Sequence, residues 1–168
     1  MLTIIAKLLK ALNSEQQPWQ LALALSFASI LGLTPLWSLH NLVVLFLLLL
    51  VRVNLSLVIL SYPLFATVGW LASSAFENVG LYLLQQTSWQ DFWTALYNHP
   101  LGRWLGMDYS ARLGSLAVAT GVALLLLPVA SFLIRMYREK LLSSIKHTRL
   151  MTYLGASRLW QLYKSMEG

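Results

Sequence analysis

The chain has 168 residues, of which 58% are apolar and 11% are charged, and its mean hydropathy is +0.65. Soluble domains carry about 25% charged residues, so this chain has too few polar groups to cover a water-facing surface, and we expect a single membrane unit without a second, soluble domain. Twelve Lys and Arg stand against six Asp and Glu, and most of the positive residues lie beside apolar runs at the two ends of the chain. This distribution favours an anionic lipid surface over nucleic acid.

The first thirteen residues combine apolar positions at three- and four-residue spacing with Lys7 and Lys10. This pattern predicts an amphipathic helix over 1–13 that lies among the lipid headgroups. Because no small-residue cleavage site follows the next apolar stretch, we expect the segment to stay in the mature protein rather than to act as a signal peptide.

Two short apolar runs follow, 19–33 and 36–51, separated by Thr34 and Pro35. Proline disfavours helix in the residue before it and cannot continue an unbroken helix, so we expect a break there. A helix as long as the first run reaches about 22 Å, which is less than the ~30 Å hydrocarbon core of a bilayer. The sequence therefore predicts a helical hairpin over 19–51 that is either re-entrant or short-spanning.

Two further runs, 55–76 and 113–134, are long enough to cross the bilayer as transmembrane helices. The stretch between them, 79–111, is aromatic and punctuated by proline and glycine, which predicts an external loop with an amphipathic helix at the membrane interface. Residues 135–168 are predicted to form a basic cytoplasmic tail helix. The predicted fold is therefore all-α and polytopic, with one membrane domain over 1–168.

Charge sets the predicted orientation, because cytoplasmic loops of membrane proteins are enriched in lysine and arginine. The tail from Arg135 onward carries seven Lys and Arg against two acids, whereas the stretch 77–112 holds three acids and two bases. We therefore expect both termini in the cytoplasm and the aromatic loop outside. Arg52 is then expected at a cytoplasmic turn, where it avoids the cost of at least ~2.5 kcal/mol that it would meet at the bilayer centre.

A polar patch interrupts the apolar runs at the predicted hairpin tip. One interpretation is that its hydroxyl, imidazole and amide groups bind an ion or a lipid headgroup at a broken helix, or relay protons. The other is that these groups cap the helices and link them by hydrogen bonds. The second interpretation is favoured, because a hairpin tip needs such caps. Arg52 and Asn54 could equally clamp a lipid phosphate or serve as a topology anchor and a helix cap. The predicted contacts for lipid or a partner are Thr34, Pro35, Trp37, Ser38, His40, Asn41, Arg52, Asn54, Trp89, Phe92 and Trp93.

No set of residues in the chain has the pattern of a catalytic site. There is no cysteine, no Gly-x-Ser-x-Gly elbow and no phosphate loop, which excludes thiolate chemistry and disfavours acyl and phosphoryl transfer. The three histidines, His40, His99 and His147, do not stand at a metal-ligand spacing. We therefore expect no catalytic residue, no metal and no cofactor, and a protein that is not an enzyme.

The motifs that carry a family resemblance are Gly32-x-x-Pro35, His40 and Arg52-x-Asn54-Leu55. They resemble the motifs of small bacterial inner-membrane proteins known as domain of unknown function 2062. The resemblance covers about residues 15–76, together with the final helix and the basic tail. It implies a bacterial inner-membrane location and favours partners that belong to the cell envelope or handle lipids. The Asn-Pro pair common in the family is replaced here by Tyr62-Pro63, which puts any role of that asparagine in doubt.

These observations favour a non-enzymatic accessory or scaffold subunit of a bacterial inner-membrane complex that serves the cell envelope or lipid transport. The alternative is a small transporter or lipid-handling protein that acts as an oligomer through the broken hairpin. The expected partners are membrane lipids and either a larger membrane or envelope protein or further copies of the chain, with no nucleic acid.

Overall fold

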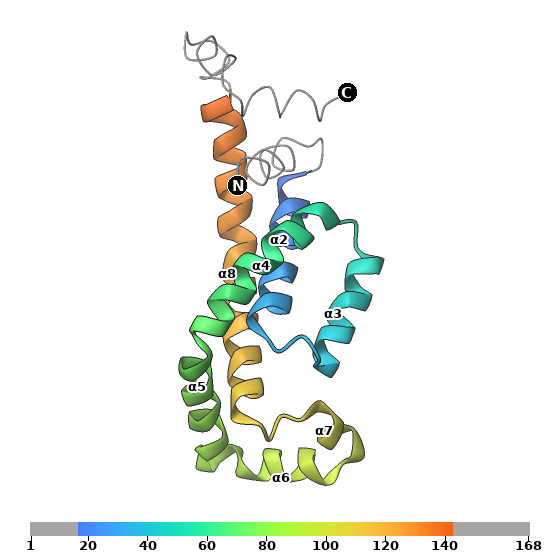
Figure 1. The fold of residues 1–168 in the computed structure, drawn as a ribbon, viewed down its shortest axis with the longest axis vertical. Helices are drawn as coiled ribbons and strands as arrows, with labels where there is room; N and C mark the ends of the chain where they lie inside the picture. Colours follow the sequence, from blue (N-terminus) through green and yellow to red (C-terminus); the bar gives the residue numbers. More distant parts are fainter. Residues whose placement is uncertain (1–16, 143–168) are drawn as a thin grey trace.

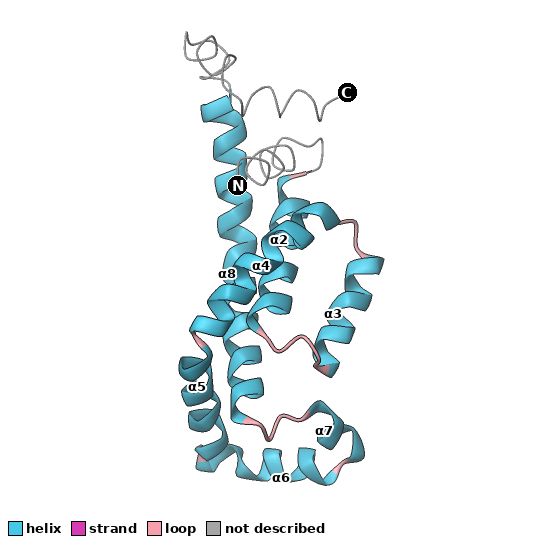
Figure 2. Ribbon diagram, in the orientation of Figure 1, coloured by secondary structure: helices cyan, strands magenta, loops and turns pink. Residues whose placement is uncertain are grey.

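The computed structural model describes residues 17–142, and in that part of the chain it contains helices joined by short turns (Figures 1 and 2). The elements are α2 (Pro18–Leu33), α3 (Leu39–Leu50), α4 (Leu55–Leu71), α5 (Ser73–Gln85), the 3-10 turn η1 (Thr87–Trp89), α6 (Gln90–Asn98), α7 (Pro100–Leu105), α8 (Ser110–Met136) and the π-helical η2 (Tyr137–Leu142). The prediction of an all-α fold is confirmed for this part. The predicted interfacial helix over 1–13, and the tail from 143 onward, lie outside the described residues.

Helix α2 is the central helix and packs between α4 and α8. It begins at Pro18, whose missing N–H costs nothing in a first turn, and it stops before Pro35, which cannot continue it. Small side chains dominate its buried positions, and the hydroxyl of Ser26 donates a hydrogen bond of 3.0 Å to the carbonyl of Ala123 in α8. Close packing through small residues and hydroxyl bonds between helices is typical of helices that associate in a membrane.

Two helix crossings depend on glycines that let backbones touch. A Cβ on Gly69 of α4 would lie 2.8 Å from the carbonyl oxygen of Gly32 in α2. A Cβ on Gly114 of α8 would lie 1.7 Å from the carbonyl oxygen of Phe76 and 2.7 Å from the amide nitrogen of Gly80, both in α5. Larger residues at these places would push α4 away from α2 and α5 away from α8.

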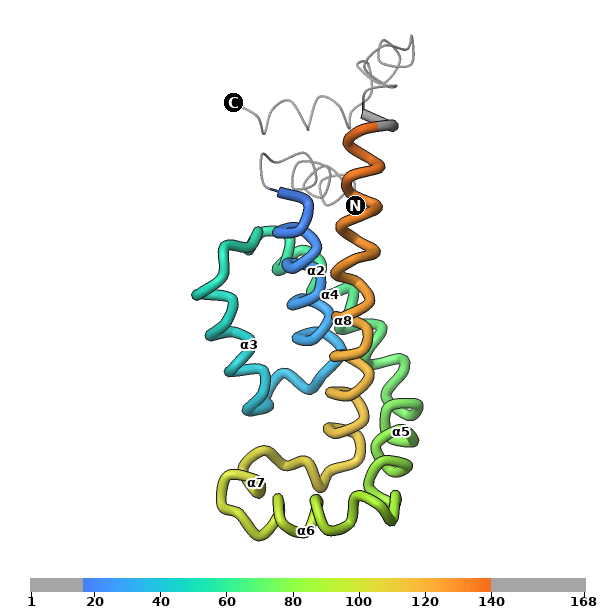
Figure 3. Tube along the Cα trace, turned by 180° about the vertical axis from the view of Figure 1, so that it is seen from behind, coloured from blue at the N-terminus to red at the C-terminus, as the bar shows by residue number. Residues whose placement is uncertain are grey.

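The run 55–76, predicted as one crossing, is divided in the structure. Helix α4 ends at Leu71, and α5 starts at Ser73 with a bend of 68° between the two helices. Helix α5 then continues into the range predicted as an external loop and lies along the first half of α8 (Figures 1 and 3). Backbone contact with Gly114 is what draws α5 onto α8, and the sequence of α4 and α5 alone does not disclose that contact.

The long apolar helix predicted over 113–134 is confirmed as part of α8. The helical stretch Ser110–Glu139 has 30 residues and is apolar enough to cross a membrane. Only 22% of its most apolar window is buried inside the protein, whereas the core helix of a soluble protein is mostly buried. Helices α4 and α5 pass the same test only when they are taken together as one bent pair. By length and composition, the described residues thus contain one candidate for a membrane-spanning helix.

Helix α3 contacts α2 and α7 and buries one narrow face, formed by Asn41, Val44 and Leu48 (Figures 1 and 3). Val44 and Leu48 belong to the same core cluster as Leu21 of α2 and Leu57 of α4. The other apolar side chains of α3 are exposed, among them Phe46 at 60%. The start of α2, the turn between α3 and α4 and the end of α8 lie toward one end of the molecule, and α6 and α7 lie at the other.

Candidate functional site

The turn between α2 and α3 is held together by its own polar side chains. The amide of Asn41 donates to the carbonyl of Pro35 at 2.9 Å, and the hydroxyl of Ser38 donates to the same oxygen at 2.6 Å. The hydroxyl of Thr34 lies 2.7 Å from the carbonyl of Ile30 and 3.0 Å from Oδ1 of Asn41, so its single proton serves one of these acceptors at a time. Three of the predicted contact residues therefore bond to the turn itself.

The same turn leaves backbone groups without partners. The N–H groups of Leu36, Trp37 and Ser38 have no hydrogen-bond acceptor within residues 17–142. Pro35 and Leu36 are exposed, and the side chain of Trp37 is 92% exposed and packs on nothing in the described chain. The predicted contact residues Pro35 and Trp37 thus lie on an open surface with unsatisfied donors beside them.

His40 lies within electrostatic reach of Arg112, a proximity that the sequence does not predict. Both ring nitrogens of His40 and Nε of Arg112 are buried without a hydrogen-bond partner. The guanidinium of Arg112 is close enough to His40 to act electrostatically on it. It also lies across Gly106, the left-handed residue that ends α7, where a Cβ would be 2.0 Å from Nη1 of Arg112. The start of α3 therefore lies over the turn that leads from α7 to α8.

A cavity of about 280 Å³ lies where two helix breaks meet, the turn after α2 and the bend between α4 and α5. Four of its lining residues carry hydroxyl groups, namely Thr34, Tyr62, Ser73 and Ser115. The remaining lining residues are Gly32, Leu33, Pro35, Ala66, Gly69, Trp70, Phe76 and Ala111. No carboxylate, amine, guanidinium or imidazole is among them, so the cavity suits a neutral group that can accept or donate hydrogen bonds.

Sequence reasoning found only one side of this cavity. Thr34 and Pro35 break an apolar run, which identifies them in the sequence, whereas Ser115 carries no such signal. Ser73 has a weak one, because Ser73 and Ser74 interrupt an apolar run. Within residues 17–142, no group of three or more His, Cys, Asp or Glu side chains is placed to hold a metal ion.

Arg52 and Asn54 lie at the far end of α3 from the turn after α2. Oδ1 of Asn54 accepts a hydrogen bond of 3.0 Å from the backbone N–H of Leu57, so Asn54 caps the start of α4. Arg52 is exposed in the turn between α3 and α4. Because the twelve residues of α3 extend about 18 Å, these two residues and the turn after α2 do not form one site.

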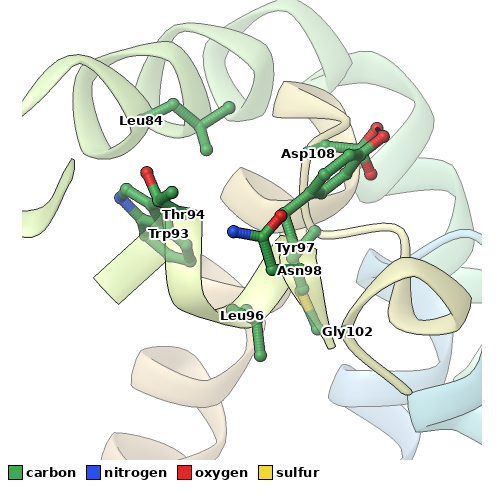
Figure 4. Close-up of a pocket in the computed structure, with 9 residues that line it drawn as sticks. Leu84, Trp93, Thr94, Leu96, Tyr97, Asn98, Gly102 and Asp108 are labelled. Atoms are coloured by element: carbon green, nitrogen blue, oxygen red, sulfur yellow. Dashed lines mark hydrogen bonds between the residues drawn. The ribbon is translucent and has the colours of Figure 1, made fainter. Parts of the chain in front are cut away.

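The aromatic residues Trp89, Phe92 and Trp93 form a cluster on η1 and α6, with ring centroids 5.0 to 6.2 Å apart. The indole N–H of Trp93 donates to the carbonyl of Leu83 at 3.2 Å, which ties α6 to the end of α5. Trp93 also lines a second cavity of about 280 Å³ (Figure 4). The predicted contact residues therefore fall into three separate places: the turn after α2, the turn before α4, and the aromatic cluster.

Comparison with known proteins identifies no relative, because no family model, no curated protein and no solved structure matches this chain. The resemblance to domain of unknown function 2062 therefore remains a prediction from the sequence motifs.

Proposed function

We propose that this chain is a non-enzymatic accessory subunit of a bacterial inner-membrane assembly, and that a larger membrane protein covers α3 and the turn after α2. The proposal rests on the unsatisfied N–H groups of Leu36, Trp37 and Ser38 beside an exposed apolar helix. In this arrangement α8 and the bent pair α4–α5 cross the bilayer, α2 and α3 form a re-entrant hairpin, both termini are cytoplasmic, and α6 and α7 lie outside.

The depth of the turn is what makes its open backbone significant. Leu33, the last residue of α2, packs with Ala119, which lies about 14 Å along α8 from its start. The turn residues Thr34 and Pro35 line a cavity with Ala111 and Ser115, which lie about 2 and 8 Å along α8. If α8 spans the bilayer from Leu113 onward, the turn lies just inside the outer boundary of the hydrocarbon region. Non-helical backbone persists at that depth only where protein covers it or where it lines a water-filled cavity. Lipid tails offer no acceptor for these donors, so a partner with polar groups is the better cover.

Photo-crosslinking in native membranes tests this proposal. A photoreactive phenylalanine analogue at Trp37 or Phe46 is expected to give a discrete adduct with a larger protein. The matched control is Phe132, an exposed aromatic residue of α8, where only lipid adducts are expected. Lipid adducts alone at all three positions would contradict the proposal, and an adduct of twice the chain's mass would replace the larger partner with a second copy.

A second candidate function is favoured by the cavity at the two helix breaks. We propose as the alternative that this cavity is water-filled and gives a small polar molecule or a lipid headgroup a path to the midplane, as broken helices do in transporters. Water in the cavity would then accept hydrogen bonds from the backbone of the turn after α2, so that no partner protein is needed to cover it.

Thiol labelling separates the two candidates, and the chain has no cysteine of its own to interfere. In the alternative, the variants Ser73→Cys and Ser115→Cys react with a charged, membrane-impermeant thiosulfonate. Leu124→Cys, on the exposed apolar face of α8, is the unreactive control. If Ser115→Cys is as unreactive as Leu124→Cys in folded protein, the cavity is dry and the alternative fails.

A further inference from the structure

A second cavity lies at the end of the molecule formed by α6 and α7 (Figure 4). Its volume is about 280 Å³, and it is separate from the cavity at the helix breaks. Its lining residues are Leu84, Trp93, Thr94, Leu96, Tyr97, Asn98, Gly102, Met107 and Asp108. They come from the end of α5, from α6 and α7, and from the turn that precedes α8.

Asp108 is the one charged residue in this lining. Its carboxylate accepts a long hydrogen bond of 3.3 Å from the hydroxyl of Tyr97 and forms no ion pair with any residue of the described chain. Asp108 is an exposed residue, so a ligand can reach its carboxylate from outside the protein. A cation in the cavity would complete the carboxylate's interactions.

Two aromatic residues line this cavity: Tyr97, which is next to the carboxylate of Asp108, and Trp93, which lies on the opposite side (Figure 4). Trp93 is held in place by its hydrogen bond to the carbonyl of Leu83, and Gly102 lets α7 approach α6 closely, since a Cβ there would be 1.7 Å from the carbonyl oxygen of Leu96. Trp93 and Tyr97 present ring surface to the cavity, and ring faces attract cations. Asn98 adds an amide oxygen that can accept a hydrogen bond from an ammonium group.

We propose that this cavity binds a primary ammonium group, with Asp108 as the counter-charge and Trp93 and Tyr97 as aromatic walls. The group has two possible sources, the ethanolamine headgroup of a phospholipid in the outer leaflet and a free amine outside the membrane. The binding site is independent of the partner proposed above, because it shares no residue with α3 or with the turn after α2.

The test is fluorine NMR of the full chain in nanodiscs, with fluorotryptophan in place of tryptophan and the Trp93 signal assigned from Trp93→Phe. Two probes are used: free ethanolamine added to phosphatidylglycerol nanodiscs, and nanodiscs in which part of the phosphatidylglycerol is replaced by phosphatidylethanolamine. We expect the Trp93 signal to shift with at least one probe, and the probe that acts identifies the source of the amine.

Asp108→Asn removes the counter-charge and is expected to raise about tenfold the probe concentration that gives half of the Trp93 shift. Asp91→Asn removes the same charge from an exposed position on α6 outside the cavity and is expected to leave the response unchanged. Tyr97→Leu, which removes one aromatic wall, is a second variant whose response is also expected to fall, with helix content by circular dichroism confirming that it folds. The proposal is overturned if neither probe shifts the Trp93 signal, or if folded Asp108→Asn and Tyr97→Leu respond like the unchanged chain.

Discussion

Two glycines of α8 illustrate how the surroundings of a residue decide its importance. A Cβ at Gly114 would collide with the backbone of α5, whereas a Cβ at Gly121 would meet nothing within 4 Å. We expect Gly114→Ala to lower the free energy of unfolding by about 1–3 kcal/mol, because α5 must move away from α8. Gly121→Ala should leave it unchanged or raise it by up to ~1 kcal/mol, since alanine is the better helix former. Denaturant unfolding in micelles measures both, and equal effects would show that α5 is not packed on α8 as described.

Asn41 is the polar residue on which the turn after α2 depends most. It is fully buried, and its amide supplies a hydrogen bond to the carbonyl of Pro35. Asn41→Ala removes that hydrogen bond and the contact with the hydroxyl of Thr34, and it leaves a cavity at a fully buried position, so we expect a loss of about 1–3 kcal/mol in the free energy of unfolding. Asn54→Ala, which removes the cap of α4, should cost about 1 kcal/mol and serves as the comparison in the same assay. A smaller loss for Asn41→Ala than for Asn54→Ala would contradict the hydrogen bonding described for this turn.

At the scale of elements, the bend between α4 and α5 shortens the distance between the two ends of this helix pair. A straight helix from Leu55 to Gln85 would extend about 45 Å, whereas two arms of the same total length bent by 68° span about 37 Å. Both end residues are exposed, so Leu55→Cys and Gln85→Cys can carry spin labels for a distance measurement by pulsed electron paramagnetic resonance. We expect the shorter distance in micelles and in nanodiscs. A distribution centred near the longer distance would show that α4 and α5 form one straight helix with no break at Ala72.

The arrangement of the whole molecule leads to a prediction about topology. We expect Thr87→Cys, at the end formed by α6 and α7, to react with an impermeant maleimide added to intact cells. Ser56→Cys, beside the turn between α3 and α4, should react only after the membrane is permeabilised. The unchanged chain, which has no cysteine, gives the background. The reverse pattern of labelling would invert the proposed orientation and would place the ammonium site in the cytoplasm.

The sequence by itself determined that the chain is helical and apolar, that a helix fills 113–134, and that the first hairpin breaks at Thr34 and Pro35. These features are local, because hydrophobic run length and the missing N–H of proline act within a few residues. Only the tertiary structure decided where α4 ends, that α3 packs on the core through one narrow face, and that Arg112 comes close enough to His40 to act electrostatically on it. Those features depend on backbone contact through glycines and on residues more than seventy positions apart, which leave no periodic pattern in the sequence. Both cavities arise in the same way, since each is lined by residues of several helices that only the packing of the chain brings together.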